Sequence, residues 1–182
     1  SALSPRRPDP PAPDGRTRPF VHMPRTIEIK ARVDDLASLA TRAAAIADSG
    51  PTPIAQDDTF FACEQGRLKL RVFADHTGEL IFYRRADQTG PKASFYRRTP
   101  TADPDALRET LALAYGITGR VVKQRTLYLV GRTRIHLDRV RGLGDFLELE
   151  VVLREDEPEP AGEREAQELM ARLGVDPDRL VD

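Results

Sequence analysis

The sequence predicts an α+β fold with a mostly antiparallel sheet of about eight strands, and three observations support this prediction. Short runs of alternating apolar and polar residues recur along the chain and are separated by turn residues. Three segments with helical spacing of apolar residues fall between groups of strands, not after every strand. This order of elements is typical of α+β proteins. About eight antiparallel strands are also enough to close a barrel.

Folded sequence is expected to begin near Arg25. Residues 26–33 alternate strictly, with apolar side chains on one face and charged side chains on the other, which predicts a strand. Asp34 is expected to cap a helix that Gly50 and Pro51 end. Turn residues then separate the next three or four predicted strands, at residues 56–63, 67–74, 79–86 and 92–98.

The second half of the chain predicts two helices and three further strand segments. One helix is expected over residues 103–115, with Pro104 in its first turn and Gly116 after its end. Strand segments are expected at residues 119–125, 126–140 with a break near Gly131, and 145–153. A last helix is expected over residues 161–173.

The first 24 residues differ in composition from the rest of the chain. They contain seven Pro and almost no apolar periodicity. Such a segment buries too little apolar surface to offset the entropy of ordering it. The sequence therefore predicts a disordered Pro-rich extension over residues 1–24 and one folded domain over residues 25–182.

Composition excludes several classes of protein. The 182 residues carry 28 Lys and Arg against 29 Asp and Glu, a net charge of -1, which argues against a protein that coats nucleic acid or a membrane surface. The single cysteine, Cys63, excludes an internal disulfide and a cysteine-rich zinc site. The chain has no apolar run of about 18 residues and no signal-peptide pattern. We therefore expect a soluble, cytoplasmic protein.

Charged residues recur on one face of several predicted strands. The groups are Lys69 and Arg71, Lys123 and Arg125, Arg134 with His136 and Asp138, and Glu148 with Glu150. A single charged strand face is usually just solvated, but six or more such strands with three helices to cover the apolar face favour a charged interior. Basic groups would then face carboxylates across a cavity. Such a cavity suits a polyanion accompanied by divalent cations.

The lysines are few and share this location. Of the 28 basic residues only four are lysines, and all four fall on the charged faces of four different predicted strands: Lys30, Lys69, Lys92 and Lys123. A compact ammonium group fits where a guanidinium fork does not. Their placement adds to the prediction of an anion-binding interior.

Two motifs are distinctive. One is Thr26-Ile-Glu28-Ile-Lys30, and the other is the run from His136 to Glu150 that contains Gly-Leu-Gly-Asp-Phe-Leu-Glu-Leu-Glu. Together they resemble the CYTH superfamily of triphosphate tunnel metalloenzymes, which includes class IV adenylyl cyclases, thiamine triphosphatases and inorganic tripolyphosphatases. Residues 56–61 and 66–71 resemble the class IV cyclase branch in particular. The resemblance covers about residues 25–182. It implies an eight-stranded antiparallel β-barrel that forms a tunnel, with helices packed outside.

The resemblance also implies functional residues. Mg²⁺ or Mn²⁺ is expected on Glu28, Glu148 and Glu150, and these residues with His136 form the candidate catalytic set. The candidate triphosphate-binding residues are Lys30, Lys69, Arg71, Arg85, Lys92, Lys123, Arg125 and Arg134. His136 has two interpretations, a general acid or base and a scaffold residue hydrogen-bonded to Asp138. For Arg85 the strand register is open, because Tyr83 and Arg85 share one face and Phe82 and Arg84 the other.

The chain departs from the family pattern at three positions. Thr26 replaces the first glutamate of the opening motif, and Ser94 and Tyr96 replace two acids of a later strand. These changes leave three outcomes open: one metal ion instead of two, an altered substrate, or a binding protein without turnover.

Three functions therefore remain. The first is a class IV adenylyl cyclase-like reaction that converts ATP to cyclic AMP and pyrophosphate. The second is hydrolysis of a triphosphate or tripolyphosphate, and the third is a non-catalytic protein that binds a nucleotide or polyphosphate. The expected partner is a nucleoside triphosphate or inorganic polyphosphate, with no nucleic acid or membrane, and the expected state is a monomer or homodimer. The absence of Trp counts against a thiamine triphosphatase.

Overall fold

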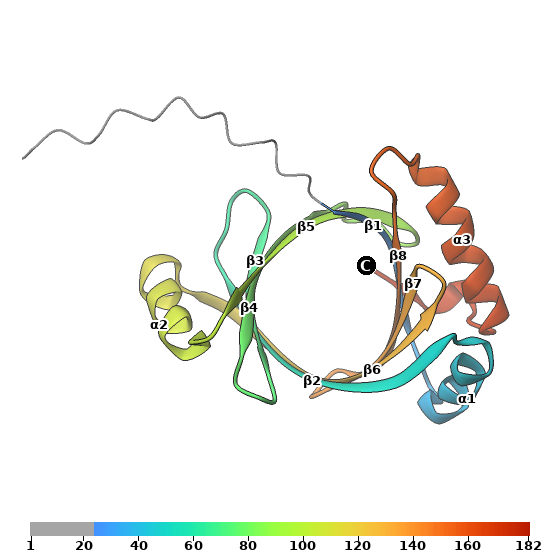
Figure 1. Ribbon diagram of the computed structural model, residues 1–182, viewed down its shortest axis with the longest axis horizontal. Coiled ribbons are helices and arrows are strands. Elements are labelled where there is room, and N and C mark those ends of the chain that lie inside the picture. The colour runs from blue at the N-terminus through green and yellow to red at the C-terminus, as the bar shows by residue number, and fades with distance from the viewer. Residues whose placement is uncertain (1–23) are drawn as a thin grey trace, which may run out of the picture.

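The computed structural model describes residues 24–182. In this part of the chain, strands form a closed ring and the helices lie outside it (Figure 1). The prediction of disorder for residues 1–24 falls, except for Pro24, outside the described residues. Within residues 24–182 no helix is long and apolar enough to cross a membrane.

The elements follow the expected order. The strands are β1 (Arg25–Arg32), β2 (Ser49–Phe61), β3 (Arg67–Phe73), β4 (Gly78–Arg85), β5 (Lys92–Thr101), β6 (Ile117–Val130), β7 (Thr133–Val140), β8 (Gly144–Val152) and β9 (Leu180–Val181). The helices are α1 (Leu36–Ile46), α2 (Pro104–Tyr115) and α3 (Glu159–Arg172), and a short 3₁₀ turn spans Pro177–Arg179.

Eight antiparallel strands close the barrel, as predicted. Their order is β5-β4-β3-β2-β6-β7-β8-β1, and β1 pairs again with β5 to complete the ring. The closing pairs run from Arg25 opposite Phe95 to Glu28 opposite Lys92. Farther along β1, the two-residue strand β9 pairs with Lys30 and Ala31. One edge of β1 is therefore shared between β5 and β9.

The hydrophobic core lies outside the barrel wall, between the strands and the helices α1 and α3. Ile27, Ile29 and Leu149 are fully buried there, and Leu169 of α3 packs against the same cluster. Because successive side chains of a strand point to opposite faces, placing these apolar residues outward directs their charged neighbours inward. The core thus fixes the polarity of the barrel interior.

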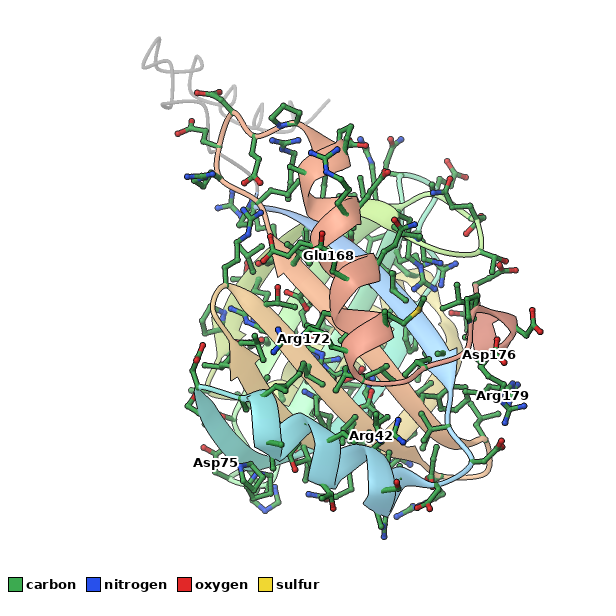
Figure 2. All side chains as sticks on the ribbon, turned by 90° about the vertical axis from the view of Figure 1, so that its right-hand side faces the viewer. Arg42, Asp75, Glu168, Arg172, Asp176 and Arg179 are labelled. Carbon is green, nitrogen blue, oxygen red and sulfur yellow. The ribbon has the colours of Figure 1, made fainter. Side chains whose placement is uncertain are left out.

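Helix α3 crosses the outside of the barrel, and α1 lies beside its C-terminal end (Figure 2). Gly162 permits close contact, because a Cβ atom there would lie 2.7 Å from Ile27 Cγ1 and 2.7 Å from Leu153 Cδ2. Arg42 of α1 donates from Nη1 to the carbonyl of Leu173 at the end of α3, at 3.1 Å. The two helices therefore form one connected cover, in which α3 lies against β1 and β8 and α1 lies against β6 and β7.

Several predicted boundaries were wrong. The side chain of Asp35, not Asp34, caps α1 by accepting from the Ser38 N–H. Strand β2 begins at Ser49, because it continues past Gly50 and Pro51 through a register shift against β6. The segments at 119–125 and 126–130 form the single strand β6, since pairing with both β2 and β7 keeps the chain extended. Strand β9 was missed because two residues are too few to show an alternating pattern of apolar and polar side chains.

Candidate functional site

A cavity of about 630 Å³ lies inside the barrel and is lined by side chains from all eight barrel strands. Eleven predicted site residues line it: Glu28, Lys30, Lys69, Arg71, Arg85, Lys123, Arg125, Arg134, His136, Glu148 and Glu150. They come from strands far apart in the sequence. The fold therefore gathers in one space the charged faces that the alternation singled out.

Lys92 is the exception among the predicted site residues. It is 2% exposed, and its Nζ donates to the carbonyl of Gln88 at 3.1 Å. It stands opposite Glu28 in the β1–β5 pairing, yet it is not among the residues that line the cavity. Its ammonium group is held by the loop before β5.

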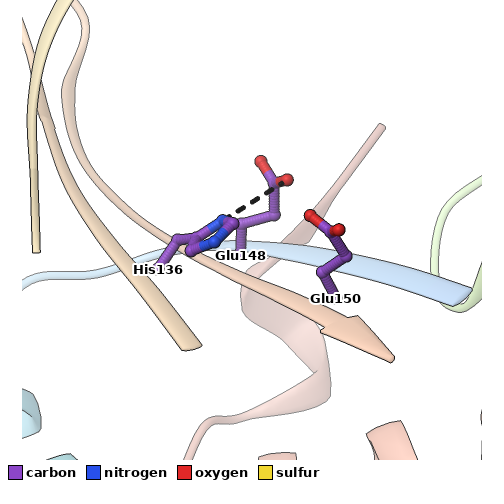
Figure 3. Close-up of side chains that lie close together, drawn as sticks. All are labelled: His136, Glu148 and Glu150. Atoms are coloured by element: carbon purple, nitrogen blue, oxygen red, sulfur yellow. Dashed lines mark ion pairs between the residues drawn. The ribbon is translucent and has the colours of Figure 1, made fainter. Parts of the chain in front are cut away.

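The acidic wall of the cavity consists of Glu28, Glu148 and Glu150. Glu28 on β1 is the direct cross-strand partner of Glu150 on β8, and His136 on β7 is the partner of Glu148. Directly opposed side chains are close neighbours, which brings these groups together. One ligand atom each of His136, Glu148 and Glu150 lies within 4.8 Å of the others, and the three side chains extend to the same side of their strands (Figure 3). This spacing suits a bound cation.

The carboxylates of the acidic wall differ in electrostatics. Burial, together with the charges of Glu148 and Glu150, raises the pKa of Glu28 to about 7. Burial also disfavours the charged form of Glu148, but His136 and Arg125 outweigh it and hold the pKa of that carboxyl well below its usual range. A divalent cation in this wall would relieve the mutual repulsion of the three carboxylates.

Two arginines that line the cavity are each held by a buried aspartate. On β3, Arg71 donates from Nε and Nη2 to the two carboxylate oxygens of Asp58, both at 2.9 Å. The Nζ of Lys69, two residues earlier, lies 3.4 Å from Asp58 Oδ2. Burial and the charge of Arg71 lower the pKa of Lys69 to about 7. We call these three residues the β3 clamp.

The β6 clamp repeats this arrangement. Arg125 donates from Nε and Nη2 to Asp138 at 2.8 and 2.9 Å, and the Nζ of Lys123 lies 3.8 Å from the same carboxylate. Burial and Arg125 lower the pKa of Lys123 to about 8. The interpretation of His136 as a residue hydrogen-bonded to Asp138 is not supported: the described residues show no such bond, and both oxygens of Asp138 accept from Arg125. Asp58 and Asp138 were not predicted as site residues, although both stand in the quoted motifs.

Three buried polar atoms have no hydrogen-bond partner among the residues that the structure describes. They are Gln56 Oε1, Arg85 Nε and His136 Nδ1, and all three residues line the cavity. Buried polar groups in folded proteins are almost always hydrogen-bonded, so exceptions call for an explanation. A polar ligand inside the barrel would supply the missing partners.

Aromatic rings mark one region of the cavity. The Nζ of Lys69 lies 5.1 Å from the ring centre of Tyr83 and 5.8 Å from that of Phe60. Arg85 also lies over Tyr83, at 5.9 Å. The open register on β4 is thereby resolved: Tyr83 and Arg85 face the cavity, whereas Arg84 donates to the carbonyl of Gln65.

The three departures from the family pattern meet where β1 and β5 close the barrel. Thr26 stands opposite Ser94, and both are buried. The Thr26 hydroxyl donates to Glu28 Oε1 at 3.3 Å, and Tyr96 lines the cavity. Hydroxyl groups here stand where the family pattern has carboxylates, so the carboxylates of the wall are concentrated on β8.

Comparison with solved structures shows the same fold in other proteins. The PH1012 protein of Pyrococcus horikoshii superposes with a TM-score of 0.75 at 21% identity, over 86% of this chain and 94% of that one. A proposed adenylate cyclase of Vibrio parahaemolyticus gives 0.71 at 17% identity, over 86% and 92%. A proposed adenylyl cyclase of Hippeastrum, described as having a dominant triphosphatase activity, gives 0.60 at 17% identity, over 84% and 89%. At these identities the likeness shows the fold alone.

Sequence comparison identifies the family. The chain is 30% identical over 87 residues to the adenylate cyclase CyaB of Aeromonas hydrophila, a match that spans 47% of this chain and 46% of that protein. The model of the CYTH domain family matches residues 24–181, which is nearly the whole described chain. With the closed eight-stranded barrel and its charged interior, this match shows that the chain belongs to the CYTH domain family.

Proposed function

We propose that the barrel cavity binds the triphosphate of a nucleoside triphosphate and that the protein acts on it with Mg²⁺ or Mn²⁺, most closely in the manner of a class IV adenylyl cyclase. The observation that carries this proposal is that one cavity is lined both by basic clamps and by carboxylates. The β3 and β6 clamps present Lys69, Arg71, Lys123 and Arg125 to the same cavity that Glu28, Glu148 and Glu150 line. Such pairing suits an anion that arrives with a cation.

Each clamp holds its arginine in a fixed orientation. Because the aspartate occupies Nε and Nη2, the remaining guanidinium N–H groups and the nearby lysine are left to donate to phosphate oxygens. Preorganised donors stabilise charge that develops in a reaction without reorienting first. The clamps are therefore suited to receive the negative charge of a leaving pyrophosphate.

On the acidic wall, Glu28, Glu148 and Glu150 would hold the metal ion. A bound divalent ion supplies Lewis acidity at a phosphoryl oxygen. In the cyclase reaction the ribose 3′ oxygen bonds to the α-phosphorus while the bond from that phosphorus to the bridging oxygen of pyrophosphate breaks. A carboxylate of the acidic wall would accept the proton of the 3′ hydroxyl, and the clamps would retain the pyrophosphate.

A second candidate is hydrolysis of the triphosphate, with water in place of the ribose hydroxyl. The triphosphatase activity described for the Hippeastrum protein of the same fold favours it. The third candidate, a protein that binds without turnover, is motivated by Thr26, Ser94 and Tyr96 in place of acids. All three use the same cavity.

One experiment separates these functions. The full chain is incubated with ATP, GTP, thiamine triphosphate or tripolyphosphate, each with Mg²⁺ or Mn²⁺, and the products are resolved by chromatography. Cyclic nucleotide with pyrophosphate supports the cyclase, orthophosphate release supports the hydrolase, and calorimetric binding without turnover supports the binding protein. If none of the four compounds binds, the proposal fails. As a matched pair, Arg125→Gln is expected to weaken binding, while Arg120→Gln on the exposed end of the same strand is not.

A further inference from the structure

We propose that His136 is a direct ligand of the metal ion, which makes the site a mixed imidazole and carboxylate site that prefers Mn²⁺ and related transition ions to Mg²⁺. The inference rests on the proposed function in one respect only, namely that the acidic wall holds a cation. It adds a ligand of different chemistry, and with it a selectivity that carboxylates alone would not give.

The first observation is the isolation of the imidazole. His136 is 5% exposed, and its Nδ1 has no hydrogen-bond partner among the described residues. The neighbouring acid, Asp138, is fully engaged with Arg125. Burying an unpartnered polar nitrogen costs free energy, and coordination of a cation would repay it.

The second observation is the distance from His136 to Glu148. Nδ1 and Oε1 are 3.9 Å apart, which is too long for a hydrogen bond. Two atoms that each lie about 2.1 Å from one ion are separated by about 3 to 4.2 Å, depending on the angle between them. The gap therefore matches two ligands of one cation better than a direct contact.

The carboxylate oxygens are divided between arginines and the centre of the site. Glu148 Oε2 lies 3.6 Å from Arg125 Nη2, and Glu150 Oε1 accepts from Arg134 Nη1 at 3.2 Å. Each glutamate thus directs one oxygen to an arginine, and its other oxygen remains for the ion. The arginines act as outer partners that orient the carboxylates, a common arrangement around metal ligands.

The strand pairing holds this geometry. His136 and Glu148 are direct partners in the β7–β8 pairing, and Glu150 lies one alternation farther along β8 (Figure 3). Sites on paired strands are positioned more precisely than sites on loops. The three ligands therefore form one preformed face for an ion.

The replaced acids reduce the oxygen ligands available on the other side. Glu28 Oε1 already accepts a hydrogen bond from the Thr26 hydroxyl, and Ser94 stands opposite Thr26. Mg²⁺ prefers a set of oxygen ligands, whereas imidazole favours first-row transition ions. With fewer carboxylates available and His136 added to the ligand set, the preference shifts from Mg²⁺ toward Mn²⁺ and related transition ions.

The test measures metal binding to the full chain without nucleotide. By calorimetry the wild-type protein is expected to bind Mn²⁺ about tenfold or more tightly than Mg²⁺. The variant His136→Gln is expected to lose that preference, with Mn²⁺ affinity reduced about tenfold or more and Mg²⁺ affinity little changed. The matched control His76→Gln changes an exposed histidine on the turn after β3 and is expected to leave both affinities unchanged.

A spectroscopic measurement on the unaltered protein makes the test independent of how the variant folds. Pulsed electron paramagnetic resonance of the Mn²⁺-loaded wild-type chain is expected to show modulation from a directly coordinated ¹⁴N nucleus. Absence of that modulation, absence of Mn²⁺ binding, or an unchanged Mn²⁺ affinity in His136→Gln would overturn the proposal. Binding of tripolyphosphate in the presence of a chelator, measured separately, shows whether the proposed function stands when His136 is not a ligand.

Discussion

Asp138 on β7 accepts hydrogen bonds from both Nε and Nη2 of Arg125 on β6, at 2.8 and 2.9 Å, with both residues buried inside the barrel. The pair lies between two adjacent strands and sets the direction of a guanidinium group that faces the cavity. Asp58 and Arg71 repeat the arrangement on β2 and β3. The arginines of both clamps are therefore each oriented by a buried aspartate.

The first prediction concerns the Asp138→Asn variant. The asparagine keeps the shape of the side chain but removes the charge that balances Arg125, and breaking a buried ion pair costs about 3–5 kcal/mol. We expect a lower free energy of unfolding, measured with denaturant, and weaker triphosphate binding. The control is Asp57→Asn, which breaks the similar but exposed pair with Arg120 and should cost about 1 kcal/mol or less. Equal losses in both variants would contradict the argument.

The second prediction concerns the metal-binding role of Glu148. The variant Glu148→Gln removes a negatively charged metal ligand. Loss of a residue that only orients a metal ligand already lowers metal affinity or activity about 10–100-fold. For a ligand itself we expect at least about a 100-fold loss of metal-dependent turnover. Circular dichroism should show an intact fold. Glu168→Gln, on the outer helix α3, serves as the control and should keep full activity (Figure 2). Undiminished turnover in Glu148→Gln would remove that residue from the site.

The third prediction concerns proton uptake. The pKa of Lys69 is lowered to about 7 and that of Lys123 to about 8, so both are partly neutral in the free protein near pH 8. A bound triphosphate favours the charged ammonium and raises both pKa values, so binding must take up protons. Affinity should therefore fall as the pH rises from about 7 to about 9.

Calorimetry at pH 8 in two buffers with different ionisation enthalpies measures that uptake directly. Lys69→Met should take up fewer protons than the wild-type chain, since one of the two titrating groups is gone. A binding enthalpy that does not depend on the buffer, or an affinity that increases with pH, would contradict the prediction.

The fourth prediction concerns Gly162 in α3. Alanine usually stabilises a helix by about 1 kcal/mol relative to glycine. Here the added Cβ would lie 2.7 Å from both Ile27 and Leu153, and overpacking costs about 1–3 kcal/mol. We therefore expect Gly162→Ala to lower the melting temperature, and Gln167→Ala on the exposed face of the same helix to leave it unchanged or slightly raised. A more stable Gly162→Ala protein would show that Ile27 and Leu153 can shift.

The alternation of single strands was enough to predict the face of most charged site residues, whereas for Arg85 on β4 it left the face open. Lys123 and Arg125 on β6 and Glu148 and Glu150 on β8 all line the cavity, as expected. Successive side chains of a strand point to opposite faces, and this alternation is a local property of the backbone that the sequence alone reveals. The eight-stranded barrel was correct for the same reason, with the family resemblance supplying its closure.

What the sequence did not reveal was which side chains are neighbours across strands. One of the two interpretations of His136 linked it to Asp138 on its own strand, but its cross-strand neighbour is Glu148 on β8, because register joins residues that are distant in sequence. Asp58 was not recognised as the partner of Arg71 for this reason. Lys92 lies on the expected face, but the carbonyl of Gln88 draws its ammonium group away from the lining.

The pairing of β1 has a consequence for biosynthesis. The first strand carries Glu28 and Lys30, yet all its partners, β5, β8 and β9, are made later. On the ribosome one edge of β1 must wait for β5, and the other must wait until β8 has emerged; contacts of such long sequence separation form slowly. Glu28 therefore meets Glu148 and Glu150 only after β8 has been made. The acidic wall is among the last parts of the barrel to assemble.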